Sequence, residues 1–157
     1  MSALLFLDLD GVLHTEYYDS WLSFSGKALT DEFGAKFSPS CIRNLNFIVK
    51  RTDAKIVLVS NWRHFGLQRM KEMWEKRSLP GIVIGMTPYL TDETGSELNR
   101  GVEIARWLQE NEAANAAYVI IDDRSEEYTD RGKLVQVGYR RGLTFWAAKR
   151  VCRILKR

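Results

Sequence analysis

Polar side chains follow three short apolar runs of the chain, at the points where buried strands would end. They are Asp8 and Asp10 after the first run, Ser60 and Asn61 after the second, and Asp122 and Asp123 after the third. In parallel α/β sheets, ligands bind at the carboxyl ends of the strands, so these side chains are candidates for a site. The two-residue spacing of Asp8 and Asp10 places both carboxylates on one face of an extended segment, and Gly11 then allows a sharp turn.

The four aspartates predict a metal site. If their strands are neighbours, up to four carboxylates converge, and like charges so close cannot all remain ionised without compensation. Oxygen ligands without Cys or His favour a hard cation, and a site that shares its ligands with a substrate phosphate is typical of Mg²⁺. A single aspartate at a strand end often only caps the next helix, but the common location of the whole set favours a site.

The hydropathy pattern predicts the elements that hold these residues. Five apolar runs indicate strands at residues 3–9, 55–60, 81–85, 118–121 and 134–137. Amphipathic stretches indicate helices that begin at Pro39 after the cap residue Ser38, run over residues 65–77 and 100–111, and begin near Thr144. This alternation is typical of βα units around a parallel sheet that is buried on both faces. The predicted fold class is therefore α/β with a five-stranded parallel sheet.

Composition and charge restrict the functional classes. The 157 residues are 45% hydrophobic and 27% charged, which indicates one globular domain over residues 1–157. Cys41 and Cys152 have no metal-ligand spacing and suit a reducing compartment, and we expect neither a signal peptide nor a membrane span, so the expected location is cytoplasmic. The phosphate-binding and dinucleotide-binding glycine motifs are absent from the sequence, so no dinucleotide cofactor is expected. From Arg131 onward there are nine Lys or Arg and no acids, although the net charge is +3.

The ordered motifs resemble those of a known superfamily. Asp8-Leu9-Asp10-Gly11-Val12 resembles the first signature of the haloacid dehalogenase (HAD) superfamily, Ser60 the second, Arg100 the third and Ile120-Ile121-Asp122-Asp123 the fourth. Arg106 is a weaker candidate for the third signature because it lies inside the predicted helix. The combination of Ser60-Asn61-Trp62-Arg63, Arg100-Gly101 with Glu103-Ile104, and Asp122-Asp123 is further similar to the HAD domain of Swiss Army Knife RNA repair proteins.

This resemblance implies a fold and a set of roles. The implied fold is a HAD-like Rossmannoid three-layer sandwich, and the two dozen residues between the first motif and Ser38 are too few for a cap domain. The implied catalytic residues are Asp8 as nucleophile and Asp10 as general acid and base. Ser60, Asn61 and Arg100 would bind the substrate phosphate. The implied Mg²⁺ ligands are Asp8, Asp10 through its backbone carbonyl, Asp122, and Asp123 through water.

The expected function is a Mg²⁺-dependent phosphatase that acts on phosphorylated nucleic-acid ends, RNA or DNA, with the basic tail attracting the polyanion. Two alternatives stay open: a phosphatase for nucleotides or small metabolites, and a non-catalytic HAD-like module that binds a partner protein. The oligomeric state is not predicted.

Four further features are ambiguous. Arg63 suits either contact with a second phosphate or a nucleic-acid backbone, or a surface salt bridge. Trp62 suits packing better than base stacking. His14 is interpreted as a residue with a local hydrogen bond. The aromatic residues 17, 18, 21 and 24 favour a packed flap over a substrate surface.

Overall fold

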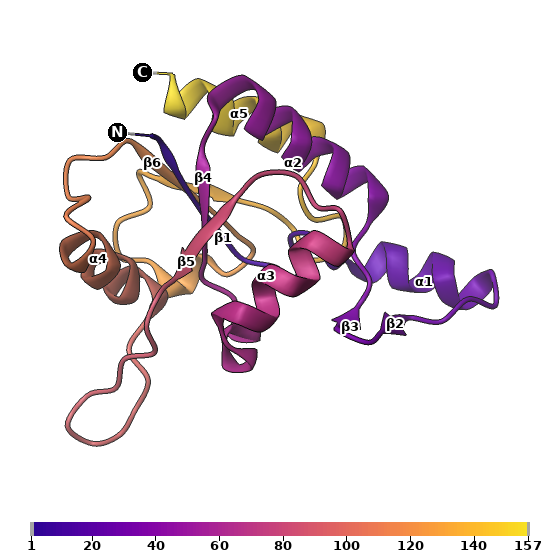
Figure 1. Ribbon diagram of the computed structural model, residues 1–157, viewed down its shortest axis with the longest axis horizontal. Helices are drawn as coiled ribbons and strands as arrows, with labels where there is room; N and C mark the ends of the chain where they lie inside the picture. Colours follow the sequence, from indigo (N-terminus) through magenta and orange to yellow (C-terminus); the bar gives the residue numbers. More distant parts are fainter. Residues whose placement is uncertain (1, 157) are drawn as a thin grey trace.

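The computed structural model describes residues 2–156, which fold around a five-stranded parallel sheet (Figure 1). The strands are β1 (Leu4–Leu7), β4 (Lys55–Leu58), β5 (Val83–Met86), β6 (Tyr118–Asp122) and β7 (Leu134–Gln136). Their order is β5-β4-β1-β6-β7, and each neighbouring pair is parallel. The predicted α/β fold class is confirmed, and β1, which leads into the first acidic motif, is the central strand.

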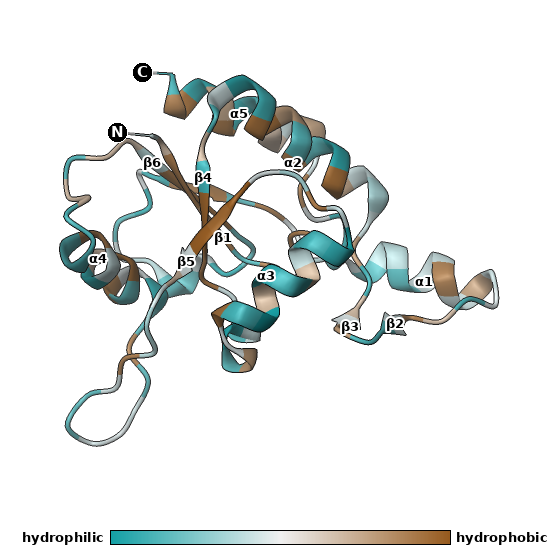
Figure 2. Ribbon diagram, in the orientation of Figure 1, coloured by the Kyte–Doolittle hydropathy of each residue, from teal (hydrophilic) through white to brown (hydrophobic). Residues whose placement is uncertain are grey.

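Helices cover both faces of the sheet, so the fold has three layers. They are α2 (Pro39–Thr52), α3 (Leu67–Lys76) and α5 (Phe145–Leu155) on one face and α4 (Arg100–Glu110) on the other. Along β1, Leu5 and Leu7 belong to the first core, whereas Leu4 and Phe6 belong to the core under α4. Figure 2 shows the result as apolar strands between helices that are polar on their outer surfaces. Burial on both faces explains why the strands read as continuous apolar runs.

Two helices begin at the predicted residues, and one of them has a side-chain cap. Pro39 is the first residue of α2, as predicted, but the Ser38 hydroxyl makes no capping bond and lies 3.0 Å from the hydroxyl of Ser40. The predicted start of α5 is correct, and there the Thr144 hydroxyl does accept a hydrogen bond from the amide of Ala147. Proline is suited to the first helical position because its fixed φ fits the helix, so the boundary of α2 does not depend on a side-chain cap.

Element boundaries differ from the prediction where the backbone turns. The predicted helix over residues 65–77 is a 3₁₀ helix, η1 (Asn61–Phe65), followed by α3, because Gly66 between them has a φ of 87°. The first strand ends at Leu7 rather than residue 9, since the chain leaves the sheet at the acidic motif. Helix α4 buries the predicted stripe of Ile104, Trp107 and Leu108. Within residues 2–156, no helix is long and apolar enough to cross a membrane.

A short flap takes the place where a cap domain could be inserted. It consists of α1 (Glu16–Phe24) and the antiparallel strands β2 (Thr30–Asp31) and β3 (Gly34–Ala35). The absence of a cap in residues 2–156 agrees with the prediction. The prediction that the aromatic side chains of the flap are packed is wrong, however, because Tyr17 and Phe24 are 69% and 93% exposed. The buried residue of α1 is Leu22. A nine-residue amphipathic helix on the outside of the body can bury only a narrow stripe.

Candidate active site

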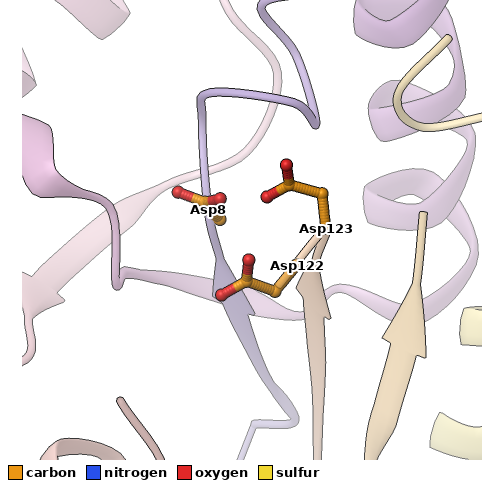
Figure 3. A group of neighbouring side chains, drawn as sticks. All are labelled: Asp8, Asp122 and Asp123. Atoms are coloured by element: carbon orange, nitrogen blue, oxygen red, sulfur yellow. The ribbon is translucent and has the colours of Figure 1, made fainter. Parts of the chain in front are cut away.

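Three carboxylates meet at the carboxyl edge of the sheet, from two neighbouring strands (Figure 3). Asp8 directly follows β1, Asp122 is the last residue of β6, and Asp123 comes next. Each contributes an oxygen atom that lies within 4.8 Å of the others. The register explains this convergence, because Leu7 pairs with Ile121 and the next residue of each strand is an aspartate. Asp10 does not join the group, so three of the four predicted carboxylates converge.

Arg100 is the cation of this acidic group. It is the first residue of α4, it is 5% exposed, and its Nη1 lies 3.2 Å from Asp8 Oδ2 and 2.7 Å from Asp122 Oδ2. The alternative candidate Arg106 lies on the exposed side of α4 and approaches Glu110 at 3.8 Å. The position at the start of the helix therefore selects Arg100 as the residue at the site.

Ser60 and Asn61 lie at the same edge because β4 is the other neighbour of β1. Ser60 is completely buried, and its hydroxyl accepts a hydrogen bond of 3.2 Å from the backbone amide of Trp62 at the start of η1. Asn61 is exposed, and its carbonyl accepts a 3.0 Å hydrogen bond from the hydroxyl of Tyr89. Ser60 thus caps the 3₁₀ helix, and the exposed side chain of Asn61 remains available to a ligand.

Asp10 stands outside the acidic group in a hydrogen-bonded cluster of its own. His14 Nδ1 lies 2.8 Å from Asp10 Oδ1, His14 Nε2 lies 2.8 Å from Asp19 Oδ2, and the indole nitrogen of Trp62 donates to Asp10 Oδ2 over 3.0 Å. The hydrogen bond with Asp10 raises the pKa of His14 to about 9. Burial raises the pKa of Asp10, but the hydrogen bonds from His14 and Trp62 outweigh it, so the pKa is lowered. The sequence carried a signal for this contact, the four-residue spacing of Asp10 and His14.

A family comparison agrees with this arrangement. The family model described as the HAD domain in Swiss Army Knife RNA repair proteins matches residues 4–147. The chain belongs to this family. The recognition made from the motifs is thereby confirmed, and the chain is placed among the HAD-type hydrolases. No significant match is found among the curated proteins or the solved structures.

The acidic group of this HAD domain fits a divalent cation. Burial and the neighbouring Asp122 raise the pKa of Asp8 well above its usual value, and the same two causes raise the pKa of Asp123. Asp122 has hydrogen-bond donors: Arg100 and the hydroxyl of Tyr128 both donate to its Oδ2, each over 2.7 Å. Asp123 Oδ1, however, is buried without a hydrogen-bond partner. An orphaned buried carboxylate oxygen next to two other carboxylates is what a cation-binding site requires before the cation is bound.

Gly11 allows the first motif of the HAD domain to approach Asp123. Its φ of 79° lies in the left-handed region, and the tight turn brings the amide of Gly11 to the carbonyl of His14 at 2.7 Å. A Cβ atom at residue 11 would lie 2.3 Å from Asp123 Oδ2. A side chain at this position would therefore strain the backbone and displace one of the three carboxylates.

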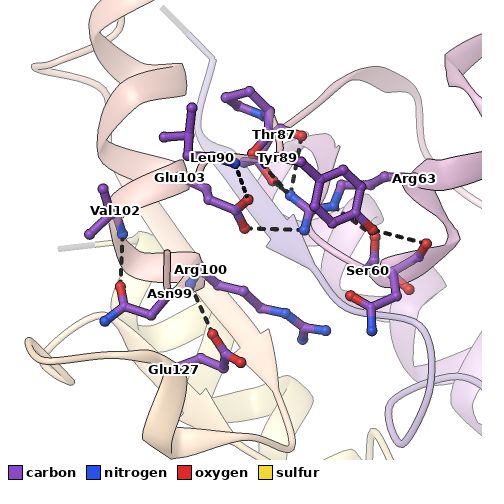
Figure 4. Close-up of polar contacts among 12 residues, drawn as sticks. Ser60, Arg63, Thr87, Tyr89, Leu90, Asn99, Arg100, Val102, Glu103 and Glu127 are labelled. Carbon is purple, nitrogen blue, oxygen red and sulfur yellow. Dashed lines mark hydrogen bonds and ion pairs between the residues drawn. The ribbon is translucent and has the colours of Figure 1, made fainter. Parts of the chain in front are cut away.

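Arg63 is neither a free phosphate ligand nor part of a surface salt bridge, which corrects both interpretations made from the sequence. Its side chain is 2% exposed, and its guanidinium lies 3.1 Å from the carboxylate of Glu103, whose side chain is 3% exposed (Figure 4). It also bonds the carbonyl of Ser60 at 2.8 Å and the hydroxyl of Thr87, while Glu103 accepts from the amide of Leu90 at 3.2 Å. The buried pair therefore ties the Ser60 turn and the following loop to helix α4, which carries Arg100.

The basic tail lies mostly away from the acidic group. Lys149, Arg150 and Arg153 are exposed on α5, as expected from their spacing. Figure 1 shows α5 running beside α2 toward the amino ends of the strands. Arg140 and Arg141 follow β7 and are exposed at the opposite, carboxyl edge. The exposed charge of the tail is thus divided between α5, whose far end is remote from Asp8, and the two arginines at the site edge.

Proposed function

We propose that this HAD domain is a phosphomonoester hydrolase that uses Asp8 as its nucleophile. In the proposed reaction, a carboxylate oxygen of Asp8 bonds to phosphorus as the ester oxygen departs, which forms an aspartyl-phosphate. Asp10 in its protonated form donates a proton to the departing oxygen, and the carboxylate that remains then accepts a proton from the water that hydrolyses the intermediate. The observation that carries the proposal is the division of the two acids: Asp8 is buried beside Arg100, whereas Asp10 lies outside the acidic group with its side chain 56% exposed.

The substrate phosphate would bind between the ends of β1 and β4. We assign its oxygens to Ser60, Asn61 and Arg100, because a fixed guanidinium and nearby hydrogen-bond donors stabilise charge that develops on the phosphoryl oxygens. Burial lowers the pKa of Arg100, but Asp8 and Asp122 outweigh this effect and raise it, so the residue stays cationic.

Mg²⁺ is the cofactor we propose. Asp8, Asp122 and the backbone carbonyl of Asp10 would hold it directly, and Asp123 would hold it through water. A bound Mg²⁺ would cancel the repulsion between the carboxylate nucleophile and the phosphate. The closely spaced carboxylates and the orphaned oxygen of Asp123 support this assignment.

Chelation is expected to eliminate hydrolysis of a phosphomonoester, and Mg²⁺ is expected to restore it. Ca²⁺ should support turnover poorly, because its looser coordination would misplace nucleophile and phosphate. Since the folded state alone presents the three carboxylates together, Mg²⁺ at a hundred times its Kd should add about 2.7 kcal/mol to the free energy of unfolding. Phosphate release and thermal unfolding, each measured with and without metal, check the two halves of this prediction.

The variant Asp122→Ala is the control for the place of the cation, and the Mg²⁺-dependent gain in stability should be lost in it. A gain equal to that of the parent protein would put the cation elsewhere. Hydrolysis that resists chelation would contradict the role of the carboxylate group itself.

Phosphorylated nucleic-acid ends are the substrates we propose, RNA or DNA. The family description, which names RNA repair proteins, supports this choice, as do the exposed basic residues and the absence of a cap over the site in residues 2–156. A nucleotide or small-metabolite phosphatase is the rival within the same chemistry. The non-catalytic module is disfavoured, because a binding module would not need both Asp8 and Asp10.

Salt is expected to separate the two substrate classes. A polyanion held by several Lys and Arg residues releases counterions on binding, whereas a mononucleotide releases few. The kcat/KM for a phosphorylated oligonucleotide should therefore fall steeply with salt, and it should fall further when Lys149, Arg150 and Arg153 are changed to Gln. Hydrolysis of a small phosphate ester should change little with the same substitutions, because these residues lie on α5, outside the site.

A matched control removes the same charge from other helices. Changing Arg43, Lys71 and Arg106 to Gln takes one exposed cation from each of α2, α3 and α4. The control should retain the steep salt dependence of the oligonucleotide. The metabolite phosphatase would be favoured if kcat/KM depended equally on salt for both substrates and the two triple variants had the same kcat/KM for the oligonucleotide.

A further inference from the structure

The carboxylate of Asp10 is held more firmly than its exposure suggests. The side chain is 56% exposed, yet both of its oxygens have protein partners, Oδ1 with His14 Nδ1 at 2.8 Å and Oδ2 with the indole nitrogen of Trp62 at 3.0 Å. Exposed carboxylates ordinarily exchange such contacts with water. Two partners from different segments of the chain fix both the position of the carboxylate and the plane of its oxygens.

The two partners are themselves immobilised. Trp62 is 8% exposed, and its ring packs against Phe37 at 5.4 Å and Phe65 at 6.4 Å between centroids. His14 is fixed at its other ring nitrogen by the carboxylate of Asp19, 2.8 Å away on α1. The contacts therefore run from η1 on one side and from the flap on the other, and they meet at Asp10.

We propose that Trp62 and His14 are positioning residues that aim the Asp10 carboxylate at the departing ester oxygen. The inference rests on the proposed function, since it assumes that Asp10 transfers the proton. A proton is transferred efficiently only over hydrogen-bonding distance, and small displacements of a catalytic group are costly. Holding the carboxylate from both sides removes rotamers in which it would face away from the substrate.

A series of leaving groups separates positioning from a merely structural role. An alkyl phosphate releases an alkoxide and needs the proton from Asp10, whereas p-nitrophenyl phosphate releases a stable phenolate and needs it far less. The measured quantity is kcat/KM with Mg²⁺ present, because it covers the steps up to the phosphorylated enzyme and excludes its hydrolysis. General damage to the site would lower kcat/KM for both substrates by the same factor.

Trp62→Phe keeps the packed ring and removes the donor. It should lose roughly 10-fold to 100-fold in kcat/KM on the alkyl phosphate and roughly threefold on p-nitrophenyl phosphate. His14→Gln, which is the second variant should the first fail to fold, should show the same selectivity. In the double variant the two losses should combine non-additively, because both residues fix one carboxylate.

Trp74→Phe is the matched control. Trp74 is 5% exposed and also donates its indole N–H, to the carbonyl of Pro80 at 2.9 Å, but it lies on α3 and does not contact Asp10. This variant should keep the parent's ratio between the two substrates. Equal losses on both substrates in the Trp62 and His14 variants, or no loss, would overturn the inference while leaving the proposed function in place. A parent protein that hydrolyses neither of these esters nor a phosphorylated oligonucleotide would instead refute the proposed function.

Discussion

Replacing Asp8 with Asn is expected to lower phosphomonoester hydrolysis by at least roughly 10⁴-fold while the fold persists. The amide has the shape of the carboxylate but lacks the nucleophilic oxygen that would bond to phosphorus. The loss should be nearly the same for alkyl and aryl phosphates, because both esters need the same nucleophile whatever their leaving group. Phosphate release and the trapping of a phosphorylated protein with labelled substrate measure the effect.

The stability of this variant gives an independent check. Burial and the charge of Asp122 raise the pKa of Asp8, so the ionised carboxylate disfavours the metal-free folded state at neutral pH. Asp8→Asn should therefore unfold at a temperature no lower than that of the parent when metal is absent. Asp53→Asn is the control, since Asp53 is 85% exposed beside Lys55 at the other edge of the sheet, and it should retain full activity. Substantial turnover by a folded Asp8→Asn protein would assign the nucleophile to another residue.

The location of the site could be predicted because it depends on periodicity and topology alone. Strands that are apolar on both faces must be covered by helices, and their polar residues can appear only where each strand ends. Asp8 and Asp122 follow from that rule, as does the nearness of Ser60. Their order along the chain then sufficed to recognise the family.

The contacts that orient the site could not be predicted, because they depend on how the loops turn. Asp10 was expected beside Asp8 from the two-residue spacing, but the turn at Gly11 carries its carboxylate to His14 and Trp62 instead. The two-residue spacing places both carboxylates together only in an extended segment, but the chain leaves the sheet after Leu7. The same difficulty applies to the hydroxyl of Tyr128, whose contact with Asp122 requires the η2 turn (Ser125–Glu127) that no apolar periodicity indicates.

Arg63 shows a second reason for the failure of local reasoning. Its partner Glu103 is distant in sequence, and charged residues are rarely buried unless they are paired. Neither residue alone therefore indicates burial. The pair becomes interpretable only when the parallel order of the sheet places the end of β4 beside the start of α4.

Glu103→Gln is expected to lower the free energy of unfolding by about 3 kcal/mol, because it leaves the buried guanidinium of Arg63 without a counter-charge. Glutamine has nearly the same volume, so loss of packing contributes little. Glu110→Gln is the matched control on the same helix. Glu110 is 55% exposed and 3.8 Å from Arg106, and exposed pairs of this kind contribute about 0.5 kcal/mol or less.

Urea denaturation with linear extrapolation measures both variants, and an unchanged dependence on denaturant would show that the folded and unfolded states expose the same surface as in the parent. Each substitution removes one carboxylate that pairs with an arginine. The difference between their losses in the free energy of unfolding therefore measures the effect of burying the pair. Burial itself raises the pKa of Glu103 while Arg63 opposes the rise, so the pair is held together against a desolvation cost. Equal small losses in Glu103→Gln and Glu110→Gln would mean that Arg63 finds other compensation, from Thr87 and the carbonyl of Ser60, and that the ion pair does not fix α4 to the end of β4.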